Sequence, residues 1–181
     1  MRQNWMLFPR AIPADVCDQL VEQYSRLPAQ EATVFNERSD VRNSKIRWVS
    51  DDEAMQELIL KFVNRANAEA FNVDIGSSVT EIQFTEYSYE NQGKYDVHHD
   101  VDWLNPKNYD RKLSVVIQLS DRNAYTGGGF YFHEVESPSS DLIKQQGSIL
   151  VFPSYLTHAV STVTEGVRHS LVSWVWGPRW R

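Results

Sequence analysis

The sequence predicts an α+β domain in which two helices precede a strand-rich half. Two features carry this prediction. In the first part of the chain apolar residues recur at helical spacing, and from Val79 onward they fall into short runs separated by glycine and asparagine turns. Helices followed by strands are typical of an α+β domain that ends in a barrel or a sandwich. With 181 residues, 41% of them hydrophobic, we expect one domain over residues 1–181.

The first predicted helix follows a short strand and turn over residues 4–13. Val16, Leu20 and Tyr24 lie at helical spacing on one face. Proline fits the first turn of a helix and aspartate can cap it, so Pro13 or Asp15 suits the start.

Residues 33–50 contain a predicted strand with one polar face. Ile46 and Trp48 alternate there with Lys45 and Arg47. Such a pattern suits a solvated edge of a sheet.

The second predicted helix opens at Asp51-Asp52-Glu53, because carboxylates are favourable at the positive end of a helix dipole. Its apolar stripe consists of Met55, Leu58, Ile59, Phe62, Val63 and Ala66. A stripe at this spacing indicates core packing rather than a ligand site, so we expect the helix to support the sheet.

The second half of the chain contains the predicted core strands. Their apolar or alternating runs cover residues 82–89, 95–98, 113–119, 149–152 and 171–176. Because turn-forming residues separate these runs, we expect them to pair into a sheet.

The overall charge narrows the classes of partner. The formal net charge is −6, which argues against a nucleic-acid backbone as the main partner. No stretch has the pattern of a signal peptide or the length and apolarity of a membrane span, so no membrane partner is expected. Cys17 is the only cysteine, which excludes a disulfide within the chain and favours a cytoplasmic location. The oligomeric state is not indicated.

His98, Asp100 and His158 are the candidate metal ligands. His98 and Asp100 are two residues apart, so on a strand both side chains leave the same face. His158 lies between apolar runs, where an imidazole without a partner would cost free energy. Two imidazoles and one carboxylate suit non-haem Fe(II) and leave positions open. His99 would point away from this face, and Asp102 would lie just beyond the chelating pair.

Arg168 is the candidate anion-binding residue. It follows His158 by ten residues, and Glu165-Gly166 is the expected turn between two strands. A hairpin of this size would place Arg168 beside the strand of His158, where its guanidinium offers a fork for a carboxylate. Ser170 lies on the same face and adds a hydroxyl donor.

Several motifs in the second half match one family pattern together. They are Tyr89, Gly93-Lys94-Tyr95, His98-His99-Asp100, residues 111–120, Gly127-Gly128-Gly129, residues 147–154, His158 and Gly166-Val167-Arg168-His169-Ser170. In order and spacing, the chain resembles the Fe(II)/2-oxoglutarate-dependent dioxygenases of the prolyl 4-hydroxylase type, including small bacterial and phage hydroxylases.

This resemblance implies a double-stranded β-helix, or jelly roll, over about residues 79–178, with helical support over about 13–72. It implies Fe(II), held by His98, Asp100 and His158, and the co-substrates 2-oxoglutarate and O₂, with ascorbate as a further cofactor. Arg168 would bind the distal carboxylate of 2-oxoglutarate, and Ser170 would assist.

The remaining candidate positions either have a second explanation or depart from the family pattern. Tyr89 matches a family tyrosine that would donate to the co-substrate, although a place in the core explains it nearly as well. Tyr95 would do the same or simply wall the pocket. Gln118 stands where relatives often carry Tyr or Phe, so one co-substrate contact would be changed. Phe130-Tyr131 departs from the usual Glu-Thr, so substrate preference would differ.

The implied activity is hydroxylation of a prolyl or other residue in a peptide or protein, or of a small molecule, with decarboxylation of 2-oxoglutarate to succinate. Stretches similar to Arg42-Asn43-Ser44 lie near the site in related enzymes, so Arg42, Arg47 and Trp48 would border the substrate groove. Further aromatic residues that could line it are Trp103, Tyr109 and Tyr125.

Two alternatives remain beside this activity. One is a non-catalytic metal-binding β-sandwich module, against which four matching site residues argue. The other is a nucleic-acid demethylase on the same scaffold, which the acidic balance disfavours.

Overall fold

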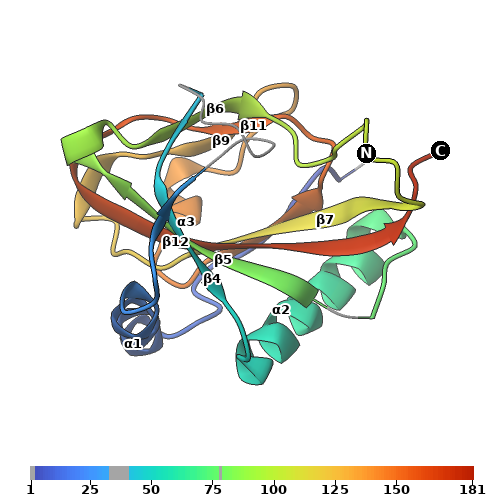
Figure 1. Cartoon of the computed structure of the whole chain (residues 1–181), viewed down its shortest axis with the longest axis horizontal. Coiled ribbons are helices and arrows are strands. Elements are labelled where there is room, and N and C mark those ends of the chain that lie inside the picture. Colours follow the sequence, from blue (N-terminus) through green and yellow to red (C-terminus); the bar gives the residue numbers. More distant parts are fainter. Residues whose placement is uncertain (1–2, 33–40, 78) are drawn as a thin grey trace.

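Two β-sheets lie face to face, and two helices cover the outer face of the larger sheet (Figure 1). This computed structural model describes residues 3–32, 41–77 and 79–181. The larger sheet has the order β1 (Met6–Phe8), β10 (Ile149–Pro153), β7 (Tyr109–Gln118), β12 (Val163–Pro178), β5 (Val79–Ser88), β4 (Lys45–Val49) and β2 (Gln30–Glu31), with β8 (Tyr125–Gly127) also paired to β12. The smaller sheet has the order β3 (Arg42–Asn43), β6 (Lys94–His98), β11 (His158–Val160) and β9 (Phe130–Phe132).

Both predicted helices are present. Helix α1 (Ala14–Ser25) starts after Pro13 and packs against β4, and α2 (Glu53–Ala66) packs against β5, β7 and β10. The Asp52 carboxylate caps α2 by accepting from the Met55 backbone N–H at 2.9 Å. A π-helical turn (Asn67–Phe71) extends α2, and short helices follow at Tyr89–Asn91 and at α3 (Ser140–Ile143).

The alternation of side chains along β7 separates the two faces of the larger sheet. Val115 and Ile117 point to the helices and are fully buried, whereas Ser114, Val116 and Gln118 point between the sheets. Successive residues of a strand point to opposite faces, so one strand supplies both the helix-side core and the wall between the sheets.

The five predicted core strands are all found, and other short elements were not predicted. They include β8, β9 and α3, each of three or four residues. Such segments are too short to show a periodic pattern. A strand carrying His158 was expected, and it forms β11. Residues 33–40 of the stretch that contains the predicted polar strand lie outside the described residues, and its remaining part forms β3 and β4.

The predicted hairpin at Glu165-Gly166 is wrong. Residues 163–178 form one continuous strand, β12, in which Gly166 adopts a positive φ of 68° next to a register shift against β8. A glycine in this conformation makes a local bulge as readily as a turn. Arg168 and His158 therefore lie on different sheets.

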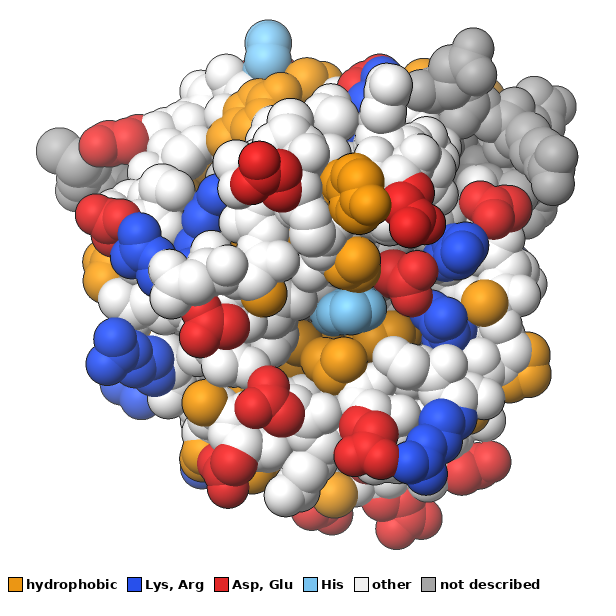
Figure 2. Space-filling view, turned by 90° about the vertical axis from the view of Figure 1, so that its left-hand side faces the viewer, with side chains coloured by type: hydrophobic (Ala, Val, Ile, Leu, Met, Phe, Trp, Pro, Cys, Tyr) orange, Lys and Arg blue, Asp and Glu red, His pale blue; other side chains and the backbone are white. Residues whose placement is uncertain are grey.

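None of the helices in the described ranges has the length and apolarity that crossing a bilayer would require. On the face of the molecule drawn in Figure 2, acidic and basic side chains of the described residues are interspersed.

Candidate metal centre and the cavity around it

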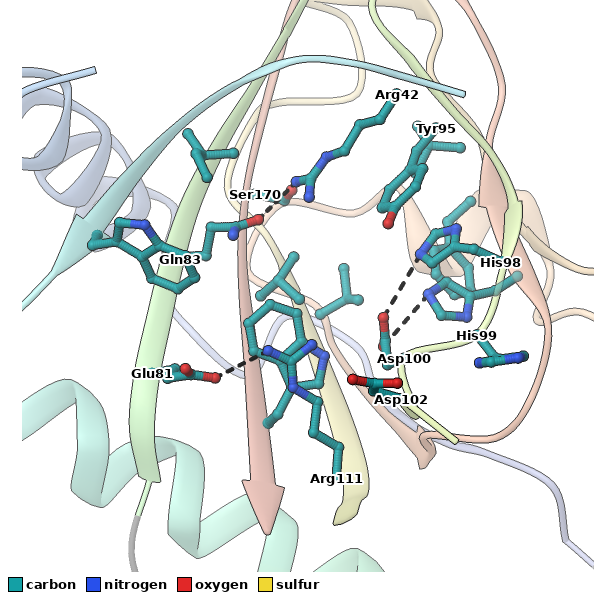
Figure 3. A pocket seen from close by; sticks show the side chains of 18 of the residues that line it. Arg42, Glu81, Gln83, Tyr95, His98, His99, Asp100, Asp102, Arg111 and Ser170 are labelled. Atoms are coloured by element: carbon teal, nitrogen blue, oxygen red, sulfur yellow. Dashed lines mark hydrogen bonds and ion pairs between the residues drawn. The ribbon is translucent and has the colours of Figure 1, made fainter. Parts of the chain in front are cut away.

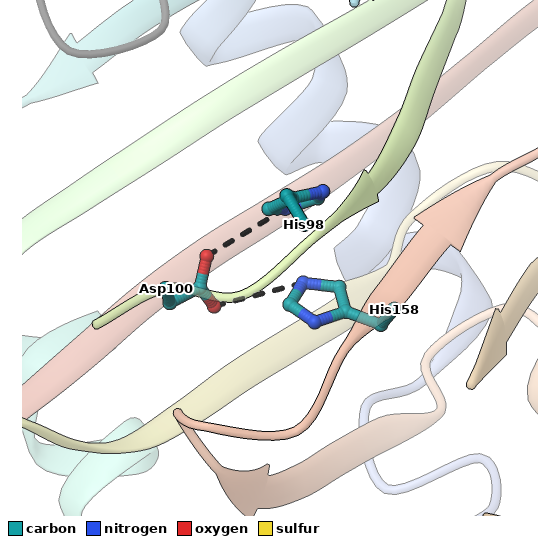
Figure 4. Close-up of side chains that lie close together, drawn as sticks. All are labelled: His98, Asp100 and His158. Atoms are coloured by element: carbon teal, nitrogen blue, oxygen red, sulfur yellow. Dashed lines mark ion pairs between the residues drawn. The ribbon is translucent and has the colours of Figure 1, made fainter. Parts of the chain in front are cut away.

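Strand pairing brings the predicted metal ligands together (Figure 4). His158 on β11 is the direct partner of His98 at the end of β6, and Asp100 follows two residues after His98. His98 Nε2 lies 3.7 Å from Asp100 Oδ1, and His158 Nε2 lies 3.6 Å from Asp100 Oδ2. One ligand atom from each side chain lies within 4.8 Å of the others, so the three could hold one metal ion.

Backbone carbonyl groups fix both imidazoles in the form that a metal needs. His98 Nδ1 lies 2.8 Å from the Asp96 carbonyl oxygen, and His158 Nδ1 lies 2.9 Å from that of Leu156. A carbonyl oxygen only accepts, so in the neutral ring each Nδ1 carries the hydrogen and each Nε2 presents its lone pair. Both lone pairs are therefore available at the centre.

Asp100 is held ionised in a dry site. Its side chain is only 7% exposed, its Oδ2 accepts from the Ser114 hydroxyl at 2.6 Å, and its backbone N–H donates to Ser154. Burial alone would raise the pKa of the Asp100 carboxyl, but His158, His98 and the Ser114 hydroxyl together lower this pKa to about 2.

Burial favours the uncharged form of His98. Burial, and then the nearby His158, lowers the pKa of His98 to about 3. Neutral imidazoles and an ionised carboxylate are the protonation states in which these groups bind a cation. The donor set of two imidazoles and one carboxylate fits Fe(II), with positions left for other ligands.

The three side chains line a cavity of about 650 Å³ between the sheets (Figure 3). Arg168 reaches into this cavity from β12, although only 3% of the residue is exposed. No carboxylate of the described residues pairs with its guanidinium, which lies over the ring of Tyr87 at 5.6 Å. A buried guanidinium without a counter-ion is costly, so the cavity favours an anionic ligand at this point.

Gln118 and Ser170 both contact Arg168. Arg168 Nε donates to Gln118 Oε1 at 3.1 Å, and Nη1 lies 3.5 Å from Ser170 Oγ. Gln118 Nε2 donates to the Ser120 carbonyl and to Tyr125 Oη, which fixes the orientation of the amide. Ser170 lines the cavity, whereas Gln118 lies behind it and holds the arginine. Gln118 thus contacts the candidate co-substrate residue Arg168, and the expectation that Gln118 changes one co-substrate contact stays a prediction.

The prediction for Tyr89 is wrong. Tyr89 lies in a short 3₁₀ helix beyond the end of β5 and is 51% exposed, away from the cavity. Tyr87, two residues earlier, lines the cavity and is 3% exposed. Tyr95 also lines it, with its ring stacked on that of His98 at 3.4 Å. The alternating face of β5 could have indicated Tyr87, because Gln83 and Tyr87 share one face.

Two of the three residues expected at the substrate groove reach the cavity, and the third does not. Arg42 and Trp48 line the cavity, but Arg47 points to the helix side and pairs with Glu86 at 3.1 Å. Trp48 and Arg47 are neighbours on β4, so their side chains leave opposite faces of the strand, whereas Arg42 reaches the cavity from β3.

Other expected positions lie at or beyond the rim. His99 lines the cavity and packs edge-on against the exposed Trp103, and Asp102 also lines it. Tyr109 is 42% exposed and Tyr125 is buried against Gln118, and neither lines the cavity.

Sequence reasoning missed a polar and aromatic wall on β5, β7 and β12. Arg111 pairs with Glu81 at 3.0 Å and lies 3.8 Å over the ring of Trp174. Gln83 and Trp176 complete this wall. Its signal was present as polar and tryptophan residues at every second position of otherwise apolar strands.

Comparison with known proteins agrees with this geometry. The family pattern of the 2OG-Fe(II) oxygenase superfamily matches residues 82–176, more than half of the chain. The chain therefore belongs to this superfamily, whose name states its use of Fe(II) and 2-oxoglutarate.

Sequence relatives include two PKHD-type hydroxylases. The one from Synechococcus sp. (strain CC9311) is 35% identical over 86 residues, which are 48% of this chain and 38% of the relative. The one from Idiomarina loihiensis is 28% identical over 137 residues, 75% of this chain and 60% of the relative. The chain thus matches less than two thirds of the length of these relatives.

Similar solved structures show the same fold. The viral collagen prolyl hydroxylase of Paramecium Bursaria Chlorella virus-1, in a 2OG complex, has a TM-score of 0.70 at 16% identity, over 97% of both chains. A Pseudomonas putida prolyl-4-hydroxylase has a TM-score of 0.73 at 19% identity, over 97% of this chain and 93% of the other. The fold is the double-stranded β-helix of these oxygenases.

Proposed function

We propose that this protein is an Fe(II)- and 2-oxoglutarate-dependent dioxygenase that hydroxylates a prolyl or other residue in a peptide or protein. Decarboxylation of 2-oxoglutarate to succinate accompanies the reaction. Ascorbate is proposed as an accessory reductant. The curated relatives are named hydroxylases, and the structural neighbours include prolyl hydroxylases.

One observation carries the proposal. Two free imidazole nitrogens and one buried carboxylate converge in the same cavity as Arg168, a buried guanidinium without a carboxylate partner. A metal-binding module would have no use for that second feature, whereas a dicarboxylate co-substrate requires a cation at its distal end.

In this proposal His98, Asp100 and His158 hold Fe(II), which supplies the oxidative chemistry when it is bound with 2-oxoglutarate and O₂. Arg168 and Ser170 bind the distal carboxylate of 2-oxoglutarate. Gln118 positions Arg168 by accepting from its Nε, so the remaining guanidinium hydrogens face the cavity. The Ser114 hydroxyl orients the Asp100 carboxylate.

The walls of the cavity have separate parts in this proposal. Val116, Phe130 and Val172 keep water from the co-substrate, since they are apolar and line the cavity near Arg168 and His158. Helices α1 and α2 serve as support, because they pack on the opposite face of the sheet.

The test is succinate formation from 2-oxoglutarate with Fe(II) and O₂, without added substrate. Wild type is compared with His158→Ala and Arg168→Ala, and Fe(II) binding is measured in parallel. We expect slow turnover in wild type, no turnover and much weaker Fe(II) binding in His158→Ala, and a much higher 2-oxoglutarate requirement in Arg168→Ala. Wild-type protein that binds neither iron nor 2-oxoglutarate would refute the proposal.

A further inference from the structure

The cavity contains two arginines without a carboxylate partner among the described residues. One is Arg168, and the other is Arg42 on β3, at the edge of the smaller sheet (Figure 3). Arg111, the third arginine of the cavity, differs because Glu81 pairs with it at 3.0 Å. The distal carboxylate of 2-oxoglutarate would neutralise only one of the two unpaired arginines.

Arg42 is held rigidly. Its Nε donates to Ser44 Oγ at 3.0 Å, and its Nη2 donates to Gln83 Oε1 at 2.7 Å. Its guanidinium also lies over the ring of Tyr95, 4.6 Å from the ring centre. A group already fixed in this way loses little further freedom when it binds a ligand, so its other N–H groups form a preorganised site.

The partners of Arg42 are fixed in turn. Ser44 and Gln83 are 1% and 3% exposed. Gln83 Oε1 accepts from Arg42 and lies 3.3 Å from Thr85 Oγ1, which leaves the amide Nε2 as the donor of this side chain. Arg42 and Gln83 therefore offer a ligand only hydrogen-bond donors. A set of donors with no acceptor among them favours an anion.

The position of Arg42 relative to the metal centre limits the size of the molecule or residue that bears the anionic group. The Tyr95 ring under Arg42 is also stacked on the ring of His98, with centres 3.4 Å apart. Arg42 is thus separated from a proposed iron ligand by one aromatic ring. A small molecule or a single amino-acid residue whose acidic group is bound at Arg42 would therefore extend to the metal centre.

We propose that Arg42 and Gln83 form a subsite for a carboxylate of the primary substrate, so that this enzyme acts on an acidic substrate. The inference rests on the proposed function, because only an oxygenase has a primary substrate to place beside the metal. The carboxylate could belong to a free acid or to an acidic residue of a peptide, and both sources offer the same planar, bidentate chemistry.

The experiment compares acids with the corresponding amides, which lack the carboxylate charge. Protein loaded with Fe(II) and saturating 2-oxoglutarate, without O₂, is titrated with three pairs: acetate and acetamide, L-proline and L-prolinamide, and N-acetylated Gly-Pro-Asp-Gly-amide and its Asp→Asn counterpart. Binding is followed by calorimetry. Because hydrogen bonds to charged groups are strong, we expect wild type to bind the acid about 10- to 100-fold more tightly in at least one pair. The pair that responds identifies the source.

Variants assign the preference to Arg42. Arg42→Gln is expected to bring acid and amide close to parity, and Arg42→Lys to keep part of the preference. Gln83→Glu keeps the guanidinium but sets a carboxylate against it, so the preference should also be lost. Arg122→Gln, which removes an exposed arginine paired with Asp141 at 3.1 Å, is the matched control and should behave as wild type. Thermal unfolding checks that each variant is folded.

Two results would overturn the inference: no acid preference in any pair, or a preference that persists in Arg42→Gln. Succinate formation by wild type separates this failure from a failure of the proposed function. Succinate without acid preference refutes the subsite alone, whereas the absence of iron binding and of succinate refutes both.

Discussion

The two faces of the larger sheet are built by the same strands and have opposite chemistry. On the helix side, Leu113, Val115 and Ile117 of β7 pack under α1 and α2. On the cavity side, the alternate residues include Ser114 and Gln118, which contact Asp100 and Arg168. Because successive residues of a strand point to opposite faces, the same strands place residues that stabilise the fold on one face and residues with a proposed function on the other.

Arginine shows the contrast most clearly. Arg47 points to the helix side, where Glu86 neutralises it at 3.1 Å. Arg168 points from the other face into the cavity, and Arg42 reaches the same cavity from the smaller sheet. No carboxylate of the described residues pairs with either arginine. An ion pair within the protein fixes structure, whereas an unpaired arginine in a cavity calls for a ligand.

The largest effect is expected from removing a proposed metal ligand in the cavity. Asp100→Ala should weaken Fe(II) binding by more than about 100-fold, because loss of a ligand's hydrogen-bond partner alone costs about 10- to 100-fold. Equilibrium dialysis measures it. Asp96→Asn, at an exposed side chain two residues before His98, is the control. Equal iron affinity in the two variants would contradict the assignment of Asp100.

Breaking the helix side should affect stability instead. Ile117 is fully buried between the sheet and the helices, so Ile117→Ala should lower the free energy of unfolding by about 2–5 kcal/mol. Urea unfolding measures the change. Iron affinity per folded molecule should stay at the wild-type value, and a loss of affinity comparable with that of Asp100→Ala would show that the faces are not separate.

A pH series tests the ion pair on the helix side. The hydrogen bond from His169 lowers the pKa of Glu86 from 4.5 to about 2, burial opposes this, and Arg47 lowers it further. Because the pKa of Glu86 is lower in the folded state than in the unfolded state, its carboxylate stabilises the fold at pH values above about 4.5. This stabilisation is lost as the pH falls from about 4.5 to about 2. The full depression corresponds to about 3 kcal/mol at most.

The matching variant is Glu86→Gln. Its unfolding free energy should lie below that of wild type at pH 7, and the gap should close as the pH approaches 2. A gap that stays constant over this range would mean that the Glu86 charge does not contribute.

The smallest effect concerns the residue behind Arg168. Gln118→Leu removes the acceptor for Arg168 Nε, so about tenfold more 2-oxoglutarate should be needed for half-saturation. The maximal rate of succinate formation and the Fe(II) affinity should change little, because Gln118 does not line the cavity. A drop in maximal rate at unchanged half-saturation would assign Gln118 a different role.

The helices, the long strands and the His98-Asp100 pair could be predicted from the sequence, because each depends on local spacing. His158 lies far along the chain, and its residue type, its apolar surroundings and the resemblance to a family pattern joined it to that pair. The placement of Arg168 could not be predicted in the same way. Its ten-residue distance from His158 fits a hairpin, but pairing with β5 and β7 draws the whole segment into the other sheet. Such non-local pairing leaves no local signal.

Tyr89 and Tyr87 differ in whether they lie on the strand. Counting back from His98 favoured Tyr89, but the strand ends at Ser88 and a 3₁₀ turn carries Tyr89 to the surface. Tyr87 is still on the strand and shares the face of Gln83. The face of a strand, rather than the distance along the chain, decides which side chain reaches the cavity.

The direct pairing of His98 with His158 links folding to the supply of metal. These residues lie opposite each other on neighbouring strands of the smaller sheet, so one bound ion would cross-link β6 and β11. A ligand at 100 times its dissociation constant stabilises the folded state by about 2.7 kcal/mol. If iron binds as proposed, the protein in an iron-starved cell would be less stable and more readily degraded, in addition to lacking activity.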